Sequence, residues 1–512
     1  MSQRPARDPE NHGIAKILAG NAPLLLYLFT SIWLVAWFVY GYGYWEDDAF
    51  IHLEFARSLF QGQGFSFGGV VTYGDTSPMW VFLLAGAHYL ISDWMLAGKL
   101  LMVLSGIAAL AALALLARKL APAGIAPSLF AAVAVVLVAT NPYFVFWLSS
   151  GMETILAVAV GLWIIRCGSD PALSWDNFWL GCLLCGLAPL LRPEFVFLDL
   201  LVAPFLVSKA WRLTTASSFG ARVAVLMVAG LLAMGPLAAW TVYAHEIFGT
   251  VISNTSAAKR ELGNGSVVRR LLSVLSFGFP VIPIFAISFP ALVVLGLLFN
   301  HAWLRRIRSL PAAFWIILGW SLVTCAFYVE NRTLVQTRYV LLFAAPLTLA
   351  VLVLVFSFER KLLSYGVGIG IGVAAVALSL AVARPFIRNK VEHVAKMGEL
   401  SEFIKTKLPP GAPVACYTIG QLAFQSEHPI VDTGGIVNPA VIPFANSLRL
   451  RANWARQRGA AYLVGGDNEQ LGPGAVFIYQ WSDHFIGWTL HLEDFNKVMV
   501  NRLWVLSDES FR

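Results

Sequence analysis

The sequence predicts an α-helical membrane protein that crosses the bilayer many times and ends in a small α/β domain. Of its 512 residues, 58% are hydrophobic and only 13% are charged, and the mean hydropathy is +0.70. Soluble proteins carry about 25% charged residues, so the chain is too apolar to be one of them. Apolar runs of membrane-spanning length continue to residue 384, and the hydropathy then falls. The chain therefore divides into a membrane domain, 21–384, and an α/β domain, 385–512.

The membrane domain contains about eleven candidate spans, because a helix needs about 20 apolar residues to cross a bilayer. These spans lie at about 21–42, 96–117, 124–140, 153–168, 177–191, 194–208, 221–243, 278–299, 312–329, 338–357 and 362–383. The apolar run at 79–91 is shorter, and we expect it to lie in the interface or to re-enter rather than to cross.

The charged residues of the loops predict the orientation of these spans. If 79–91 does not cross, one side of the membrane receives most of the basic residues of the short loops. These are Arg4, Arg7, Lys16, Arg118, Lys119, Arg166, Lys209, Arg212, Arg305, Arg306, Arg308, Arg360 and Lys361. Cytoplasmic loops are enriched in such residues, so the N-terminal segment 1–20 is predicted inside and the C-terminal domain outside. The net charge of +7 then reflects topology and not a nucleic-acid partner.

The C-terminal domain is predicted from alternating helical and β-type patterns after Arg384. The segment 391–407 has the pattern of an amphipathic helix, and the PPG at 409–411 indicates a turn. Short β-type runs follow at 413–418, 429–432, 460–464 and 475–480.

The first outer loop, 43–80, is unusually acidic for a segment at a membrane surface. Glu46, Asp47, Asp48, Glu54 and Asp75 face a single basic residue of the loop, and ionisable groups at such positions often mark a functional site. Asp47 and Asp48 could act as a general base with a neighbour that orients substrate, with or without a divalent cation. They could equally cap a helix at the membrane surface.

Other polar residues are predicted on the same outer side. Glu153 could face the cavity of Asp47, with Ser149 or Ser150 as helix caps, and Arg192 and Glu194 could form a site or a buried pair. Four basic residues are predicted on the outer side, against the positive-inside rule. Their position favours a role in phosphate recognition, although contact with lipid headgroups is an alternative. They are Lys259, Arg260, Arg332 and Arg338, of which Arg338 is the preferred candidate.

Histidine and cysteine residues give no metal-site pattern. His52, His88 and His245 have no ligand spacing, so each is interpreted as a surface or internally satisfied side chain. Cys182 and Cys185 lie in an apolar span, where inert thiols are the better interpretation.

Several motifs, in order along the chain, resemble those of integral-membrane glycosyltransferases with the GT-C fold. EDDAFIHLEFARSLFQGQGFSF, YGDTSPMW, SGMET, LRPEF, FGTVISNTSAAK and TRYVLLFAAPL resemble motifs of the arabinofuranosyltransferase branch, both cell-wall terminal and pilin-glycosylating. The tail segment TIGQLAFQSEHPIVDTGGIVNP resembles that branch's outer domain. The chain departs from the branch at Phe50, Thr250, Ser256 or Ala257, and Asn438, which bears on the sugar and the acceptor.

The resemblance implies transfer of a sugar, in the first instance arabinofuranose, from a polyprenyl-phosphate donor to an acceptor hydroxyl with inversion. By motif, Asp47 becomes the expected general base, Asp48 orients substrate or a cation, and Arg338, or else Lys259, binds the phosphate. The remaining matches imply substrate-binding roles for Arg192, Glu194, Glu153, Asn254, Tyr73 and Trp80.

The expected partners are a polyprenyl-phosphate-linked sugar, a glycan, lipid or protein acceptor, and membrane lipids, with no nucleic acid. The expected location is a bacterial inner membrane with the active site facing the periplasm or cell exterior. A lipid-linked glycan ligase or polymerase stays an alternative function. A flippase is less favoured because the centres of the spans hold few charges.

Overall fold

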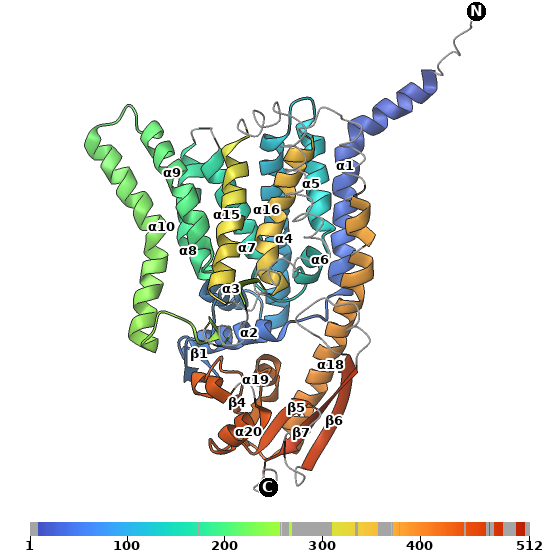
Figure 1. The fold of residues 1–512 in the computed structure, drawn as a ribbon, viewed down its shortest axis with the longest axis vertical. Coiled ribbons are helices and arrows are strands. Elements are labelled where there is room, and N and C mark those ends of the chain that lie inside the picture. The colour runs from blue at the N-terminus through green and yellow to red at the C-terminus, as the bar shows by residue number, and fades with distance from the viewer. Residues whose placement is uncertain are drawn as a thin grey trace, which may run out of the picture.

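The fold was analysed in a computed structural model of the chain. It describes residues 9–170, 174–256, 310–332, 336–356, 372–377, 379–444, 447–466, 476–484 and 498–506, with a few single residues between these ranges. The elements form a helical bundle with a smaller domain at one end, and the N-terminus lies at the opposite end of the bundle (Figure 1).

The bundle is built from helices whose apolar composition leaves few positions for charge. The described helices are α1 (Pro9–Tyr40), α4 (Trp94–Leu120), α5 (Pro127–Ala139), α6 (Pro142–Trp147), α7 (Thr154–Ser169), α8 (Trp175–Leu191), α9 (Phe195–Leu213), α10 (Phe219–Phe248), α15 (Ala312–Glu330) and α16 (Thr337–Phe356). Within the described residues, four helices are long and apolar enough to cross a membrane: Asn21–Tyr40, Trp94–Leu120, Phe219–Phe248 and Ala312–Glu330. Shorter apolar helices pack among them.

The acidic first loop folds into a layer at the end of the bundle that faces the smaller domain (Figure 1). It contains α2 (Asp47–Phe60), a short hairpin of β1 (Ser66–Phe67) and β2 (Val70–Val71), and α3 (Pro78–His88). At 11 residues, α3 is only about 16 Å long at 1.5 Å per residue, which is too short to cross a bilayer. This length agrees with the expectation that the run at 79–91 does not span.

In its described part, the C-terminal domain combines a mixed sheet with α-helices and a short 3-10 helix, Pro439–Phe444. A π-helical turn, Ser379–Ala383, leads into α18 (Arg384–Lys407), and α19 (Gly420–Ser426) and α20 (Leu448–Arg456) follow. The strands are β3 (Val414–Cys416), β4 (Ile430–Asp432), β5 (Tyr462–Gly466), β6 (Val476–His484) and β7 (Val498–Val505), in the order β4-β3-β5-β7-β6. The sheet is parallel from β4 to β5 and antiparallel from β5 to β6.

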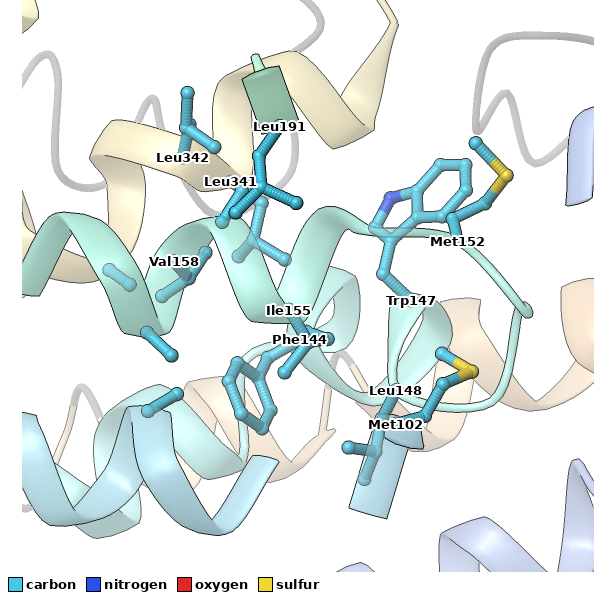
Figure 2. Packing of buried hydrophobic residues seen from close by; sticks show 14 of the residues in the cluster. Met102, Phe144, Trp147, Leu148, Met152, Ile155, Val158, Leu191, Leu341 and Leu342 are labelled. Atoms are coloured by element: carbon cyan, nitrogen blue, oxygen red, sulfur yellow. The ribbon is translucent and has the colours of Figure 1, made fainter. Parts of the chain in front are cut away.

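One continuous apolar core joins the bundle to the layer formed by the first loop and to part of the C-terminal domain. Phe144 of α6, Val158 of α7 and Leu341 of α16 belong to it (Figure 2). So do Phe50 of α2 and Ile419 just before α19. The loop layer is therefore held between two apolar surfaces, and its polar residues are fixed against them.

The helical prediction is confirmed for most spans, and three local expectations change. The π-helical turn at Ser379–Ala383 carries the chain directly into α18, so this helix begins earlier than residue 391. Strand β7 was not predicted, and neither Ser149 nor Ser150 caps α7, whose N-cap residue is Glu153 without a side-chain capping bond. The predicted span at 278–299 lies outside the described residues, so the expected number of about eleven spans stays a prediction.

Candidate active site

A cavity of about 350 Å³ lies between the loop layer, the bundle and the C-terminal domain. Charged side chains from four separate segments of the chain face it. Its lining comprises Asp47, Asp48, Ile51, His52, Gly74, Asp75, Thr76, Met152, Glu153, Arg192, Thr255, Ala258, Gln336, Arg338, Tyr417, Thr418, Gly434 and Ile436. The volume lies near the lower end of the range of about 300–1,000 Å³ that is typical of small-molecule sites, which suits a small polar group such as a monosaccharide ring.

Asp47 and Asp48 begin helix α2, which places both carboxylates at the cavity. Acidic residues suit the first turn because the exposed amide groups there carry partial positive charge. Glu46, the N-cap residue, makes no side-chain capping bond. The two aspartates belong to the first turn of α2 and are not its N-cap, and His52 follows Asp48 one turn later on the same face.

Asp47 is held by the main chain of the C-terminal domain. The N–H groups of Gly420 and Gln421 donate to its Oδ2 and Oδ1 over 3.1 and 3.0 Å. Burial raises the pKa of Asp47 to about 6, while the two amides oppose the rise and the charge of Asp48 adds to it. A carboxylate with this pKa is mostly ionised near neutral pH and can still accept a proton, as a general base must.

Asp48 forms an ion pair with Arg338 of α16. The NH2 group of Arg338 donates to Oδ2 of Asp48 over 2.6 Å, and its NH1 reaches the sulfur of Met152 at 3.7 Å. The guanidinium is buried, and among the described residues its Nε has no hydrogen-bond partner. Arg338 therefore presents a buried cation with an unused donor beside the cavity.

His52 lies between two carboxylates on the cavity wall. Its Nδ1 is 2.5 Å from Oδ2 of Asp75, and its Nε2 is 3.3 Å from Oε2 of Glu153, an ion-pair contact without the geometry of a hydrogen bond. Burial by itself would lower the pKa of His52, but the charges of Asp75 and Glu153 outweigh it and raise that pKa to about 10. The imidazole is therefore a cation at neutral pH.

Arg192 continues this network into the bundle. It donates to Glu153 from NH1 over 3.1 Å and to Glu194 from NH2 over 2.9 Å, and Tyr328 donates to the same Glu194 oxygen over 2.7 Å. All four side chains are buried. Arg192 and Glu194 thus form the pair expected from LRPEF, and Arg192 also faces the cavity.

Four residues expected at the substrate do not line the cavity: Glu194, which pairs with Arg192, and Asn254, Tyr73 and Trp80, which lie in the surrounding packing. Asn254 donates from Nδ2 to Oγ1 of Thr72 over 3.1 Å, and the hydroxyl of Tyr73 accepts from Nε1 of Trp240 over 2.8 Å. The Trp80 indole is buried and donates to the carbonyl oxygen of Gly151 over 3.1 Å. Their neighbours Gly74, Asp75 and Thr255 line the cavity instead. Lys259, the second candidate for phosphate binding, and Arg260 lie outside the described residues.

Sequence reasoning missed His52 and Asp75 as residues of the cavity. The spacing of Asp48 and His52 on a helix was a usable signal, because residues four apart share a face. Asp75 carried no such signal, since its pairing with His52 depends on how the loop closes. Gln336, Tyr417 and Thr418 also line the cavity without having been predicted.

A divalent cation beside Asp48 stays a prediction. Within the described part of the chain, no group of three or more histidine, cysteine or acidic residues is arranged to hold a metal ion. Asp48 is paired with Arg338, and Asp47 is held by main-chain amides. These residues do not form a metal-binding set, and no chemical step below passes through a metal.

Comparison with solved structures gives the class of fold. The structure resembles that of ArnT from Cupriavidus metallidurans bound to undecaprenyl phosphate, at 15% sequence identity and a TM-score of 0.53. The match covers 95% of this chain and 99% of the ArnT chain. The apo state of the same protein matches at 15% identity and a TM-score of 0.52, over 94% of this chain and 98% of the ArnT chain. The chain is a multi-pass membrane protein with the GT-C fold.

The arabinofuranosyltransferase AftD from Mycobacteria matches at 13% identity over 94% of this chain and 42% of that chain, but its TM-score of 0.44 is too low to support an argument. Residues 385–505 match the family described as Domain of unknown function (DUF8728). No curated protein matches the sequence.

Proposed function

We propose that this protein is a membrane glycosyltransferase that moves a sugar from a polyprenyl-phosphate donor to an acceptor hydroxyl. The observation that carries the proposal is that a candidate base and a buried cation line the same cavity. Asp47 is a carboxylate with a pKa of about 6, and Arg338 is a buried guanidinium with an unused Nε donor. The GT-C fold, which the chain shares with a protein whose structure holds undecaprenyl phosphate, supports the same class of donor.

In the proposed reaction, Asp47 takes the proton of the acceptor hydroxyl. The acceptor oxygen forms a bond to the anomeric carbon as the bond from that carbon to the phosphate oxygen breaks. The bonding electron pair leaves with the polyprenyl phosphate, whose growing negative charge Arg338 stabilises through Nε and its neighbouring N–H groups. Attack opposite to the leaving group inverts the anomeric centre.

Asp48 has a supporting role in this scheme. In the structure it neutralises Arg338, and a donor phosphate would compete with it for the same guanidinium. Release of Asp48 from Arg338 would free a carboxylate oxygen for a sugar hydroxyl. This exchange of partners matches the orienting role expected for Asp48.

The finer assignments rest on the sequence motifs. Arabinofuranose is the proposed sugar, and the proposed site faces the outside of a bacterial inner membrane. Residues of the loop layer, the bundle and the C-terminal domain line the cavity, and the loop layer and this domain lie at one end of the bundle (Figure 1). The distribution of basic loop residues predicts that this end is the outer one.

The test is sugar transfer by membranes that contain the full-length protein, supplied with a polyprenyl-phosphate arabinofuranose donor. Asp47→Asn should lower the rate by about 10²–10⁴-fold, the usual contribution of a general base. Asp93→Asn is a matched control, because Asp93 caps α4 outside the cavity and asparagine caps equally well. An Asp47→Asn variant as active as Asp93→Asn would overturn the assignment of the base.

A further inference from the structure

The C-terminal domain meets the first loop at the proposed catalytic base. The amides of Gly420 and Gln421 donate to the two carboxylate oxygens of Asp47 over 3.1 and 3.0 Å. The partners are more than 370 residues apart in the sequence (373 and 374). Asp47 therefore takes its position from two parts of the chain at once.

The contact is close enough to require a residue without a side chain at position 420. A Cβ atom added to Gly420 would lie 2.0 Å from the carbonyl oxygen of Asp47 and 3.1 Å from its Oδ1. A second close approach occurs at the cavity rim, where a Cβ atom on Gly74 would lie 2.8 Å from the carbonyl oxygen of Ile436. Main chain thus packs directly on main chain at both places.

The same domain forms one wall of the cavity through two loops. Tyr417 and Thr418 follow β3, and Gly434 and Ile436 follow β4. The second loop is fixed by Asp432, whose carboxylate accepts the amides of residues Gly434, Gly435, Val437 and Asn438. The main chain of this loop in the cavity wall is therefore held in one conformation by the carboxylate of Asp432.

Contacts around Asp47 fix the domain against α2. Arg57 donates to the carbonyl oxygen of Phe424 over 3.0 Å, and its guanidinium lies 4.8 Å from the centre of that ring. The ring of Phe50 lies 5.9 Å from the same ring, and Lys390 of α18 pairs with Glu46 at 2.8 Å. These contacts keep the amides of α19 in register with the carboxylate.

We propose that the C-terminal domain is a working part of the active site, and that Gly420 and Gln421 are positioning residues that hold and ionise Asp47. The inference rests on the proposed function, because it assigns a partner to the base of that reaction.

The two amides have a predictable effect on protonation. Hydrogen bonds to a carboxylate favour the ionised form, so their loss should raise the pKa of Asp47 and move the acid limb of the activity profile to higher pH. The other groups that act on Asp47 are Asp48 on its own helix, His393 of α18 and Cys416 of β3, and Arg338 of α16 is paired with Asp48. None of them is altered by a substitution at residue 420.

The experiment compares Gly420→Ala with Gly398→Ala in the full-length protein. A Cβ atom on Gly398 of α18 would meet only side-chain atoms of Gln421 and Gln425 at 3.8 and 3.9 Å, which is ordinary contact. We expect Gly420→Ala to lower transfer at least tenfold and to move the acid limb up by about one pH unit, as the loss of one hydrogen bond to a charged group would. Gly398→Ala should leave both quantities unchanged. A folded Gly420→Ala variant with the rate and profile of Gly398→Ala would overturn the inference.

A second variant decides the question if Gly420→Ala does not fold. Arg57→Gln removes the contact with Phe424 without adding an atom near Asp47, and it should move the acid limb in the same direction by a smaller amount. An unmoved limb in folded Arg57→Gln would count against the inference. Asp47→Asn, assayed alongside, separates the two ideas. An inactive Asp47→Asn with normal Gly420→Ala rejects only the role of the domain, whereas an active Asp47→Asn rejects the proposed base itself.

Discussion

Arg338 of α16 and Asp48 of α2 form an ion pair of 2.6 Å in the lining of the cavity, although 290 residues separate them in the sequence. The pair joins the bundle to the loop layer at the site proposed for the donor phosphate. Without a phosphate, Asp48 is the counter-charge of the buried guanidinium. The pair thus combines a structural contact with a binding site that is ready for an anion.

Substitution of Arg338 should affect the reaction more than the fold. Arg338→Gln should lower transfer by about 10²–10³-fold, as the loss of a donor to developing charge does in other enzymes. Arg338→Lys keeps the charge but loses the planar fork, so an intermediate rate is expected. Initial rates at equal protein level measure this, and a glutamine variant that keeps a tenth of the activity would remove Arg338 from the mechanism.

Loss of the His52 side chain should destabilise the protein, because it leaves Asp75 without its cation and removes one of the cations beside Glu153. Removing one member of a buried ion pair typically costs about 3–5 kcal/mol. His52→Asn should therefore lower the Tm of the purified protein clearly, and His52→Asn with Asp75→Asn should recover part of the loss. The double-mutant cycle measures this coupling, and strictly additive effects would contradict the proposed network.

The raised pKa of His52 predicts a pH dependence of stability. The ordinary pKa is 6.5 and the folded value is about 10. The contribution of His52 is therefore complete below pH 6.5 and is lost as the pH rises to about 10, at up to about 1.4 kcal/mol per pH unit. Thermal unfolding between pH 6.5 and 10 should show this decline in the wild type and a flatter one in His52→Asn. Parallel curves would show that His52 is not charged in the folded protein.

The pKa of about 6 for Asp47 predicts the acid limb of the activity. Below pH 6 the carboxyl is protonated and cannot accept the acceptor's proton, so kcat/KM, which reports the pKa values of the enzyme without substrate, should fall tenfold per pH unit on that side. Initial rates at donor concentrations well below KM, measured from pH 5 to 8, test this. A flat profile across pH 6 would mean that another group is the base.

The sequence singles out Asp47, Asp48 and Arg338, which all line the cavity, because each breaks a local rule. Adjacent carboxylates follow an apolar run, and an arginine stands on the side where basic residues are scarce. The residues that contact these three side chains could not be predicted from the sequence in the same way. Gly420 is one of many glycines, and its approach to Asp47 depends on how two distant segments pack.

The helical bundle was predictable for a similar reason. Apolar length is a strong signal for spans such as α4 and α10, whereas strand β7 has a weaker pattern and was missed. The sequence motifs place Tyr73, Trp80 and Asn254 near the site. Whether each side chain points to the cavity or into the packing depends on how the loop folds. For these three, the side chains join the packing around the site.

The junction at Asp47 has a consequence for the history of the protein. On the side of the C-terminal domain, most of its hydrogen bonds use main-chain groups, namely the amides of Gly420 and Gln421 and the carbonyl oxygens of Phe424 and Val437, while Lys390 contributes a side chain. Almost any amino acid supplies these main-chain groups, so the domain can drift far in sequence while the contact persists, provided that position 420 stays small. Such a surface would leave little trace for a comparison of sequences to detect.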